Sequence, residues 1–291
     1  MLISIKTLLG APYNKKHVGF ALYRFFQWKF IRFFKPKEVR LNIWGDRQVL
    51  LYPDSIQSMW FMYNYWVDWE EFNLIKDIIR QDDILLDIGA NIGFYTLWMS
   101  RFIGKGSVHS FEPDEKNFQR LDRNINLNGL GSVIKANKTA VSEKTGTLFL
   151  TQDRDTMNHL TYEKTTGAVS ISTITLDEYC QANNINRIKY LKIDIEGFEM
   201  TAFKGGEQLL RNGAIGIIQL EINNALNNSG ITEEQLVSYL AGFGYQLATY
   251  DIPAKKIKRI GLSRQRENYF AIKDTPWIRE QLTASGIQLE K

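Results

Sequence analysis

Cysteine and histidine are scarce in this chain, and their scarcity limits the sites that it can form. Cys180 is the single cysteine, which excludes an internal disulfide bond and leaves no cysteine-based metal cluster. The histidines are His17, His109 and His159, too few for a histidine-rich metal site to be expected. The sequence therefore indicates no dedicated metal centre, and no metal ligand is assigned.

Long apolar runs are missing as well. No run approaches the roughly 18 residues of a membrane span. Near the N-terminus, Arg24, Lys29 and Arg32 interrupt the apolar residues too early for a signal-peptide core, and no small-residue cleavage site follows. Internal repeats and low-complexity linkers are not found. We therefore expect a cytoplasmic protein without a signal peptide or a transmembrane helix.

The composition is that of an ordinary soluble globular protein, with 44% hydrophobic and 23% charged residues. The net charge of +4 is unevenly distributed. Residues 1–48 carry ten Lys and Arg against Glu38 and Asp46, so the remaining residues are net acidic. The sequence thus predicts a basic N-terminal segment in front of a mildly acidic main domain.

Residues 20–37 interleave eight aromatic with five basic residues. One interpretation is a helix that lies on an anionic membrane, with aromatic side chains on one face and basic groups on the other. The alternative is a helix that packs its aromatic residues onto the core and turns Arg and Lys outward. Nucleic-acid binding is not expected, because the aromatic residues are too dense and no RNA-binding motif accompanies them.

From Asp82 onward, predicted strands and helices alternate, which is typical of a parallel sheet covered on both faces. We expect an α/β fold with a doubly wound, mostly parallel sheet of seven strands, the last two forming an antiparallel pair. A separate strand pair is expected around residues 39–51, and additional strands flank a polar loop at 152–167. The seven strands are predicted at residues 84–86, 107–111, 132–136, 188–193, 215–220, 245–250 and 267–272.

A glycine-rich turn, Asp87 to Gly93, follows the first buried strand of this domain. Glycines in such a turn let the backbone approach a ligand closely, and Gly89 can adopt a φ that other residues avoid. The spacing is D-x-G-x-x-x-G, with Asn91 where the dinucleotide pattern G-x-G-x-x-G has its second glycine. This turn leaves no evident cradle for a pyrophosphate, and it suits S-adenosylmethionine.

A second acidic residue follows the next strand, in the pair Glu112-Pro113. A carboxylate about 20 residues beyond the glycine turn is placed to accept hydrogen bonds from both ribose hydroxyls of a cofactor. Both dinucleotide and S-adenosylmethionine folds use this arrangement. Glu112 therefore supports a ribose without distinguishing between the two cofactors.

Acidic residues also end two later strands, as Asp194 and Glu196 after one and Glu221 after the next. Since open α/β sheets bind ligands at the carboxyl ends of their strands, we expect one shared cleft. A carboxylate raised in pKa by its neighbours could take a proton from an acceptor hydroxyl. The acids could instead hold Mg²⁺ or Ca²⁺, or bind the cofactor's ammonium group. His159, on the polar loop, is a further candidate base.

Several segments resemble motifs of the FkbM-like family of S-adenosylmethionine-dependent methyltransferases. The segment Leu191–Glu199, which reads LKIDIEGFE, resembles the most characteristic of them. The others are Leu85–Tyr95, Phe111–Pro113, Thr175–Asp177, and Asn137 with Ala140–Ser142. The resemblance covers about residues 82–250, and the basic aromatic arm has no counterpart in it.

The resemblance implies a Rossmann-like class I methyltransferase fold that transfers methyl from S-adenosylmethionine to a hydroxyl oxygen, often on a sugar or a secondary metabolite. Asp194 would lie near the methyl group. The cofactor site would be lined by Asp87, Gly89, Ala90, Asn91, Gly93, Glu112, Pro113, Ala140 and Asp194.

The chain is accordingly divided into an N-terminal extension (1–80), a methyltransferase domain (81–275) and a C-terminal tail (276–291). The function expected is an O-methyltransferase acting on a saccharide, glycoconjugate or secondary metabolite. The alternatives are a non-catalytic or membrane-associated module with the same fold and, less favoured, a nicotinamide-dependent oxidoreductase.

Overall fold

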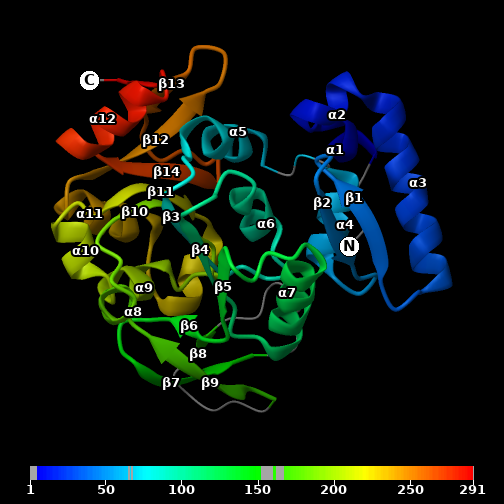
Figure 1. Cartoon of the computed structure of the whole chain (residues 1–291), viewed down its shortest axis with the longest axis horizontal. Helices are drawn as coiled ribbons and strands as arrows, with labels where there is room; N and C mark the ends of the chain where they lie inside the picture. Colours follow the sequence, from blue (N-terminus) through cyan, green and yellow to red (C-terminus); the bar gives the residue numbers. More distant parts are fainter. Residues whose placement is uncertain (1–4, 65, 67, 152–159, 162–166, 291) are drawn as a thin grey trace. The chain divides into compact units, whose positions relative to one another are not determined.

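The computed structural model describes residues 5–64, 66, 68–151, 160–161 and 167–290. The chain forms two compact units, Met1–Phe72 and Asn73–Lys291 (Figure 1). The predicted boundary between residues 80 and 81 falls after helix α5 (Trp69–Ile78), whereas the observed boundary falls within that helix.

The first unit combines short helices with a β-hairpin. Strands β1 (Val39–Ile43) and β2 (Arg47–Leu51) pair antiparallel, as the sequence predicted. The helices are α1 (Ile5–Gly10), α2 (Pro12–Lys16), α3 (Val18–Phe34) and α4 (Ile56–Tyr63).

Helix α3 is oriented by a buried arginine. Arg24 is only 6% exposed, and its Nε and Nη2 donate to the carbonyls of Met62 (2.9 Å) and Phe61 (3.1 Å). These are carbonyls of the last turn of α4, which a cation satisfies well. Trp28 is buried on the same side, whereas Phe26 and Phe30 are exposed. The alternative prediction placed the aromatic side chains toward the core and the basic ones outward. It is confirmed for Trp28, and it is wrong for Arg24, which is buried, and for Phe26 and Phe30, which are exposed.

The second unit is built on a mixed sheet that contains nine of the described strands, in the order β15-β13-β12-β14-β11-β10-β3-β4-β5 (Figure 1). The sheet is parallel from β11 through β10, β3 and β4 to the edge strand β5. Strand β14 pairs antiparallel with both β11 and β12, which confirms the predicted antiparallel pair. The strands are β3 (Ile84–Ile88), β4 (Ser107–Phe111), β5 (Ile134–Asn137), β10 (Ile188–Ile193), β11 (Ile215–Glu221), β12 (Tyr245–Asp251), β13 (Lys256–Arg259), β14 (Asn268–Lys273) and β15 (Gln288–Leu289).

The α/β fold with a large mixed sheet is thus confirmed, and all seven predicted strands are present. Strands β13 and β15 extend the predicted sheet by pairing with β12 and with each other. Residues 276–291, predicted as a tail, form helix α12 (Pro276–Ala284) and β15. Ile278, Leu282 and Ile287 are buried there, so this segment is part of the packed unit.

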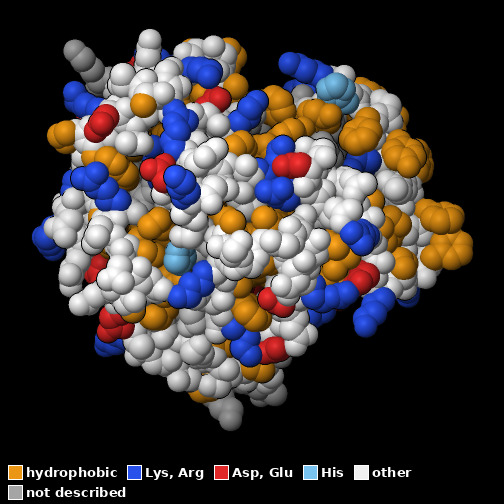
Figure 2. Space-filling view, in the orientation of Figure 1, with side chains coloured by type: hydrophobic (Ala, Val, Ile, Leu, Met, Phe, Trp, Pro, Cys, Tyr) orange, Lys and Arg blue, Asp and Glu red, His pale blue; other side chains and the backbone are white. Residues whose placement is uncertain are grey.

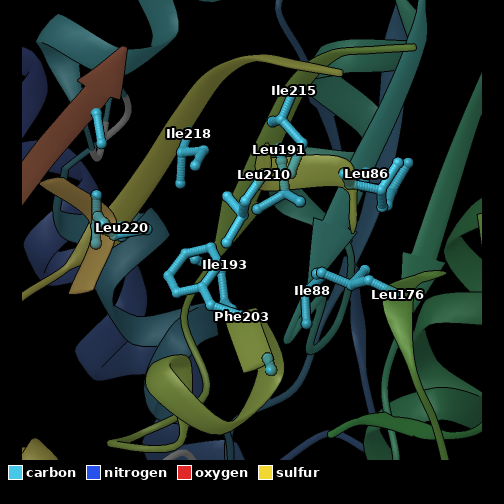
Figure 3. Close-up of a cluster of buried hydrophobic side chains, with 14 of the residues drawn as sticks. Leu86, Ile88, Leu176, Leu191, Ile193, Phe203, Leu210, Ile215, Ile218 and Leu220 are labelled. Atoms are coloured by element: carbon cyan, nitrogen blue, oxygen red, sulfur yellow. The ribbon is translucent and has the colours of Figure 1, made fainter. Parts of the chain in front are cut away.

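A buried apolar cluster joins the central strands to the helices that follow them. Leu191 and Ile193 of β10 pack with Leu86 and Ile88 of β3 and with Phe203, as Figure 3 shows. The remaining helices of the unit are α6 (Phe94–Ser100), α7 (Glu115–Leu127), α8 (Leu176–Ala182), α9 (Glu199–Lys204), α10 (Glu207–Arg211), the 3₁₀ helix η2 (Asn224–Ser229) and α11 (Glu233–Gly242).

A smaller sheet lies in the same unit, with strand order β6-β9-β7-β8 among the described residues. Its strands are β6 (Ala140–Val141), β7 (Gly146–Leu150), β8 (Leu160–Thr161) and β9 (Val169–Ile174). Asp177 of helix α8 accepts hydrogen bonds from the backbone of Gln208 and Leu209. That contact fixes the start of α10 and accounts for the Thr-Leu-Asp motif of the sequence.

Candidate active site

The glycine turn after β3 is held to the neighbouring strand by its own backbone. The N–H groups of Gly89 and Ala90 both donate to the carbonyl of Phe111, at 3.0 and 2.9 Å. Gly89, Asn91 and Gly93 have φ values of +79°, +51° and +96°, a region that glycine enters at little cost. The D-x-G-x-x-x-G spacing therefore matches the conformation that the turn adopts.

Gly89 also faces the end of β10. A Cβ atom at this position would lie 1.9 Å from the carbonyl oxygen of Asp194. The N–H of Asp194 in turn donates to the carbonyl of Ile88 at 3.1 Å. The glycine turn and the Asp194 loop are therefore in direct backbone contact, as the shared-cleft prediction requires.

Glu112 connects the turn to helix α7. One carboxylate oxygen accepts from the Asn91 N–H at 2.8 Å and the other from the Asp114 N–H at 2.9 Å. Burial raises the pKa of Glu112 to about 7. Pro113 lies between the two contacts and is partly exposed.

Asp87 points into the interior. Its side chain is fully buried, and one oxygen accepts from Thr96 Oγ1 at 2.5 Å. The other oxygen lies 3.8 Å from Lys192 Nζ and has no hydrogen-bond partner among the described residues. Burial raises the pKa of Asp87. The contacts of this carboxylate are thus with protein groups beneath the turn.

Lys192 is the cation at the centre of the site. Its side chain is buried in β10, one strand away from Asp87. The ammonium group donates to the carbonyl of Gly89 and to Asp194 Oδ2, both at 3.2 Å, and lies 5.2 Å from the ring centre of Tyr95. Lys192 therefore links the glycine turn to Asp87 and Asp194.

The loop after β10 is fixed by a buried glutamate. Glu199 Oε1 accepts from the N–H groups of Ile195 (3.0 Å) and Gly197 (3.4 Å), and burial raises the pKa of Glu199 to about 7. At Gly197 the φ is +102°, and a Cβ would lie 1.9 Å from the carbonyl oxygen of Ala225. The D-x-E-G-x-E segment therefore specifies a tight loop against η2.

Three of the predicted acids come together at the ends of β10 and β11. Asp194 lies close to the Glu221 carboxyl, and the Asp194 side chain is 39% exposed. Burial and the proximity of Asp194 hold the pKa of Glu221 well above its ordinary value. Burial, followed by Asp194 and Glu199, raises the pKa of Glu196 to about 7. Carboxyl groups so close together cannot all ionise at neutral pH.

Two further predicted residues lie differently. Ala140 is buried in β6, in a small apolar cluster with Phe198 against which Ile195 packs, so it supports the Asp194 loop through packing. His159 lies outside the described residues. Within the described part of the chain, no group of three His, Cys, Asp or Glu side chains could hold a metal ion.

Sequence reasoning did not select several side chains that organise the site. Gln219 bridges Tyr190 and Tyr95 through hydrogen bonds of 2.7 and 2.8 Å, and Lys192 lies against Tyr95. A signal for Lys192 existed in the sequence, because it is one of two lysines in the buried strand Ile188–Ile193 and lies two residues before Asp194. A polar residue at such a position needs a buried partner.

Comparison with known proteins shows which family the chain resembles. The family model described as the methyltransferase FkbM domain matches residues 87–247, which is more than half of the chain. Hexuronic acid methyltransferase AglP of Haloferax volcanii is 25% identical over 179 residues, covering 62% of this chain and 72% of the relative. The 2-O-methyltransferase NoeI of Sinorhizobium fredii is 24% identical over 155 residues, covering 47% and 63%.

Among solved structures, the methyltransferase FkbM of Methylobacillus flagellatus is similar with a TM-score of 0.45 and 17% identity. The match covers 67% of this chain and 44% of that one, so this chain spans less than half of that protein. The family match extends from Asp87 through the glycine turn and the Asp194 loop to β12. The chain belongs to the FkbM methyltransferase family, and it is a methyltransferase.

Proposed function

We propose that this chain transfers a methyl group from S-adenosylmethionine to a hydroxyl of a saccharide or glycoconjugate. The observation that carries the proposal is Asp194 itself, which accepts from Lys192 Nζ at 3.2 Å, adjoins the Gly89 turn and lies close to Glu221. Such a carboxylate gives a site for accepting a hydroxyl proton beside a site for a nucleotide cofactor.

The residues of the turn fit the cofactor. Glu112 is the carboxylate for the ribose hydroxyls, since its two oxygens have further acceptor capacity beyond the Asn91 and Asp114 N–H groups. The Asn91 Oδ1 atom is buried without a hydrogen-bond partner among the described residues, so it offers an acceptor at the turn. When bound, the cofactor supplies an electrophilic methyl group on a sulfonium.

An acceptor hydroxyl held beside Asp194 would lose its proton as it receives the methyl group that the bound cofactor would supply. Asp194 holds the hydroxyl by a hydrogen bond and takes its proton. Glu221, which keeps its own proton at neutral pH, lies close to Asp194. Lys192 fixes the orientation of Asp194 from the other side.

A saccharide acceptor is supported by the relatives and by the chemistry of the acidic side chains. AglP is named for a hexuronic acid, and NoeI for 2-O-methylation. A group of carboxyls, with Asp194 partly exposed and Glu196 beside it, suits acceptors that present several hydroxyl donors. The proposal that an oxygen atom is methylated rests on the same carboxyl groups.

Replacing Asp194 with Asn tests the assignment. General-base catalysis contributes roughly a factor of 100 to 10,000 to the rate. We therefore expect turnover with uronic acid glycans to decrease by a factor in that range. The affinity for S-adenosylhomocysteine should change by no more than a few-fold, because the side chain does not form the glycine turn. Turnover is measured by transfer of labelled methyl, and affinity by calorimetry.

The matched control is Asp122→Asn, on the exposed surface of α7, where the carboxylate accepts a hydrogen bond from Asn126 Nδ2 at 2.9 Å. This variant should keep full turnover. Undiminished turnover in Asp194→Asn would reject Asp194 as the base, and loss of cofactor affinity in the same variant would assign it to binding.

A further inference from the structure

Helix α3 exposes an aromatic surface that the proposed function does not use. Within the described part of the chain, the large hydrophobic side chains that are exposed all lie on this helix. Figure 2 shows them as a group of orange side chains over α3, at the right of the view. They are Val18, Phe20, Tyr23, Phe26, Phe30, Phe33 and Phe34, with Phe33 80% exposed.

The position of these residues on the helix makes their exposure unusual. Residues spaced three, four and seven apart share one face of a helix, which places Tyr23, Phe26, Phe30 and Phe33 together. The rings of Phe30 and Phe34 are 4.5 Å apart, so the surface is continuous. The opposite face, with Ala21, Arg24, Trp28 and Ile31, is the buried one. The helix therefore turns an apolar face outward where a soluble helix has its polar face.

The charge around this surface is of one sign. Residues 1–37 contain no Asp or Glu. Lys29, Arg32, Lys35 and Lys37 are exposed on the helix or directly after it, and Lys29 Nζ lies 5.4 Å from the ring centre of Phe25. An aromatic face bordered by lysine and arginine is complementary to a surface that is apolar below and anionic above.

We propose that α3 binds peripherally to an anionic lipid bilayer, lying in the headgroup region with its phenylalanine face toward the acyl chains. At 17 residues the helix is about 26 Å long, which suits an orientation along the membrane surface. None of the described helices is long and apolar enough to cross a bilayer. This docking surface is independent of the methyl-transfer chemistry.

Sedimentation of the full chain with vesicles tests the proposal. The chain should sediment with vesicles of phosphatidylcholine and phosphatidylglycerol, and much less with phosphatidylcholine alone. The variant Phe26→Ser/Phe30→Ser/Phe33→Ser should lower the partition coefficient by roughly a hundredfold, because three large apolar side chains no longer enter the membrane. Far-UV circular dichroism checks that the variant is folded.

A charge variant keeps the test decisive if the phenylalanine variant misfolds. Lys29→Gln/Arg32→Gln/Lys37→Gln should weaken binding to the anionic vesicles by tenfold or more, roughly as expected for three charges near a membrane. The control Lys105→Gln/Lys144→Gln/Arg264→Gln removes the same charge from exposed positions of the second unit and should bind as the unchanged chain does.

Three results would overturn the proposal. The first is a folded full chain that does not sediment with anionic vesicles. The second is equal loss of binding in both charge variants, which would indicate attraction by net charge alone. The third is a chain that is dimeric in solution and does not bind vesicles, and whose phenylalanine variant is monomeric. That result would assign the aromatic face to contact with a second copy of the chain.

Discussion

Buried carboxyl groups dominate the chemistry of this site at the level of single residues. Burial raises the pKa values of Glu112, Glu196 and Glu199 to about 7, and Glu221 is raised further beside Asp194. Such groups hold their protons near neutral pH. The site can therefore retain a proton at one carboxyl while a neighbouring one accepts another, which is the property that the proposed transfer to a hydroxyl needs.

Glu199 offers a stability test of these raised values. Its pKa lies near 7 in the folded chain and near the ordinary value of 4.5 when unfolded, so between these values the folded chain holds a proton that the unfolded chain has lost. Ionisation of Glu199 therefore lowers the free energy of unfolding progressively as the pH rises from about 4.5 to 7. Glu199→Gln should stabilise the chain at pH 8 by on the order of 2 to 3 kcal/mol relative to its effect at pH 5.

Urea denaturation at the two pH values measures this difference. Glutamine keeps the acceptor for the Ile195 and Gly197 N–H groups, so the loop should stay intact. Glu280→Gln, at an exposed position of α12, is the control that removes the same charge from the surface. An effect of Glu199→Gln that is equal at both pH values would contradict the account of Glu199.

The backbone contact between the glycine turn and the β10 end defines the site at the level of elements. Gly89→Ala should lower the free energy of unfolding by roughly 3 kcal/mol or more, because the added Cβ meets the Asp194 carbonyl and the φ is positive. It should also weaken binding of S-adenosylhomocysteine by at least about tenfold, which is 1.4 kcal/mol. Gly129→Ala separates the effect of the positive φ from the effect of the steric contact. Gly129 has a φ of +64°, but a Cβ added there would meet no atom within 4 Å.

Gly129→Ala should cost only about 1 kcal/mol and leave the affinity unchanged. Denaturation and calorimetry on both variants check the comparison. Equal effects of the two substitutions would mean that the close approach of the Gly89 turn to Asp194 is unimportant.

The central strands could be predicted from the sequence because long apolar runs specify buried parallel strands. Strands β13 and β15 could not, since they are short, and their places in the sheet depend on the pairing of β13 with β12 and of β15 with β13. The helical segment after the Asp194 loop is divided into α9 and α10 at Gly205 and Gly206. A Cβ on Gly205 would lie 2.0 Å from the carbonyl of Ser142, a contact that only the tertiary structure reveals.

The residues of the candidate site could be predicted where they directly follow, or end, a predicted strand. Gly89, Glu112, Asp194 and Glu221 follow strands that meet at one edge of the sheet, and the structure brings them together there. Lys192 was not selected, because its importance depends on contacts across strands. The roles of all these residues in binding and catalysis remain predictions that the variants test.

At the scale of the whole molecule, two units carry two separate properties. The second unit holds the described site residues from Asp87 to Glu221, and the first holds the aromatic face of α3. The family match begins at residue 87 and so covers only the second unit. Transfer chemistry is accordingly expected to survive changes on α3, and membrane binding to survive changes at Asp194.

Calorimetric titration of the full chain with S-adenosylhomocysteine, with NAD as the control ligand, tests the central claim most directly. We predict a dissociation constant on the order of micromolar for S-adenosylhomocysteine and no measurable binding of NAD, since the Gly89 turn and Glu112 fit a ribose without a pyrophosphate cradle. A folded chain that bound NAD, or neither ligand, would contradict the proposed cofactor site.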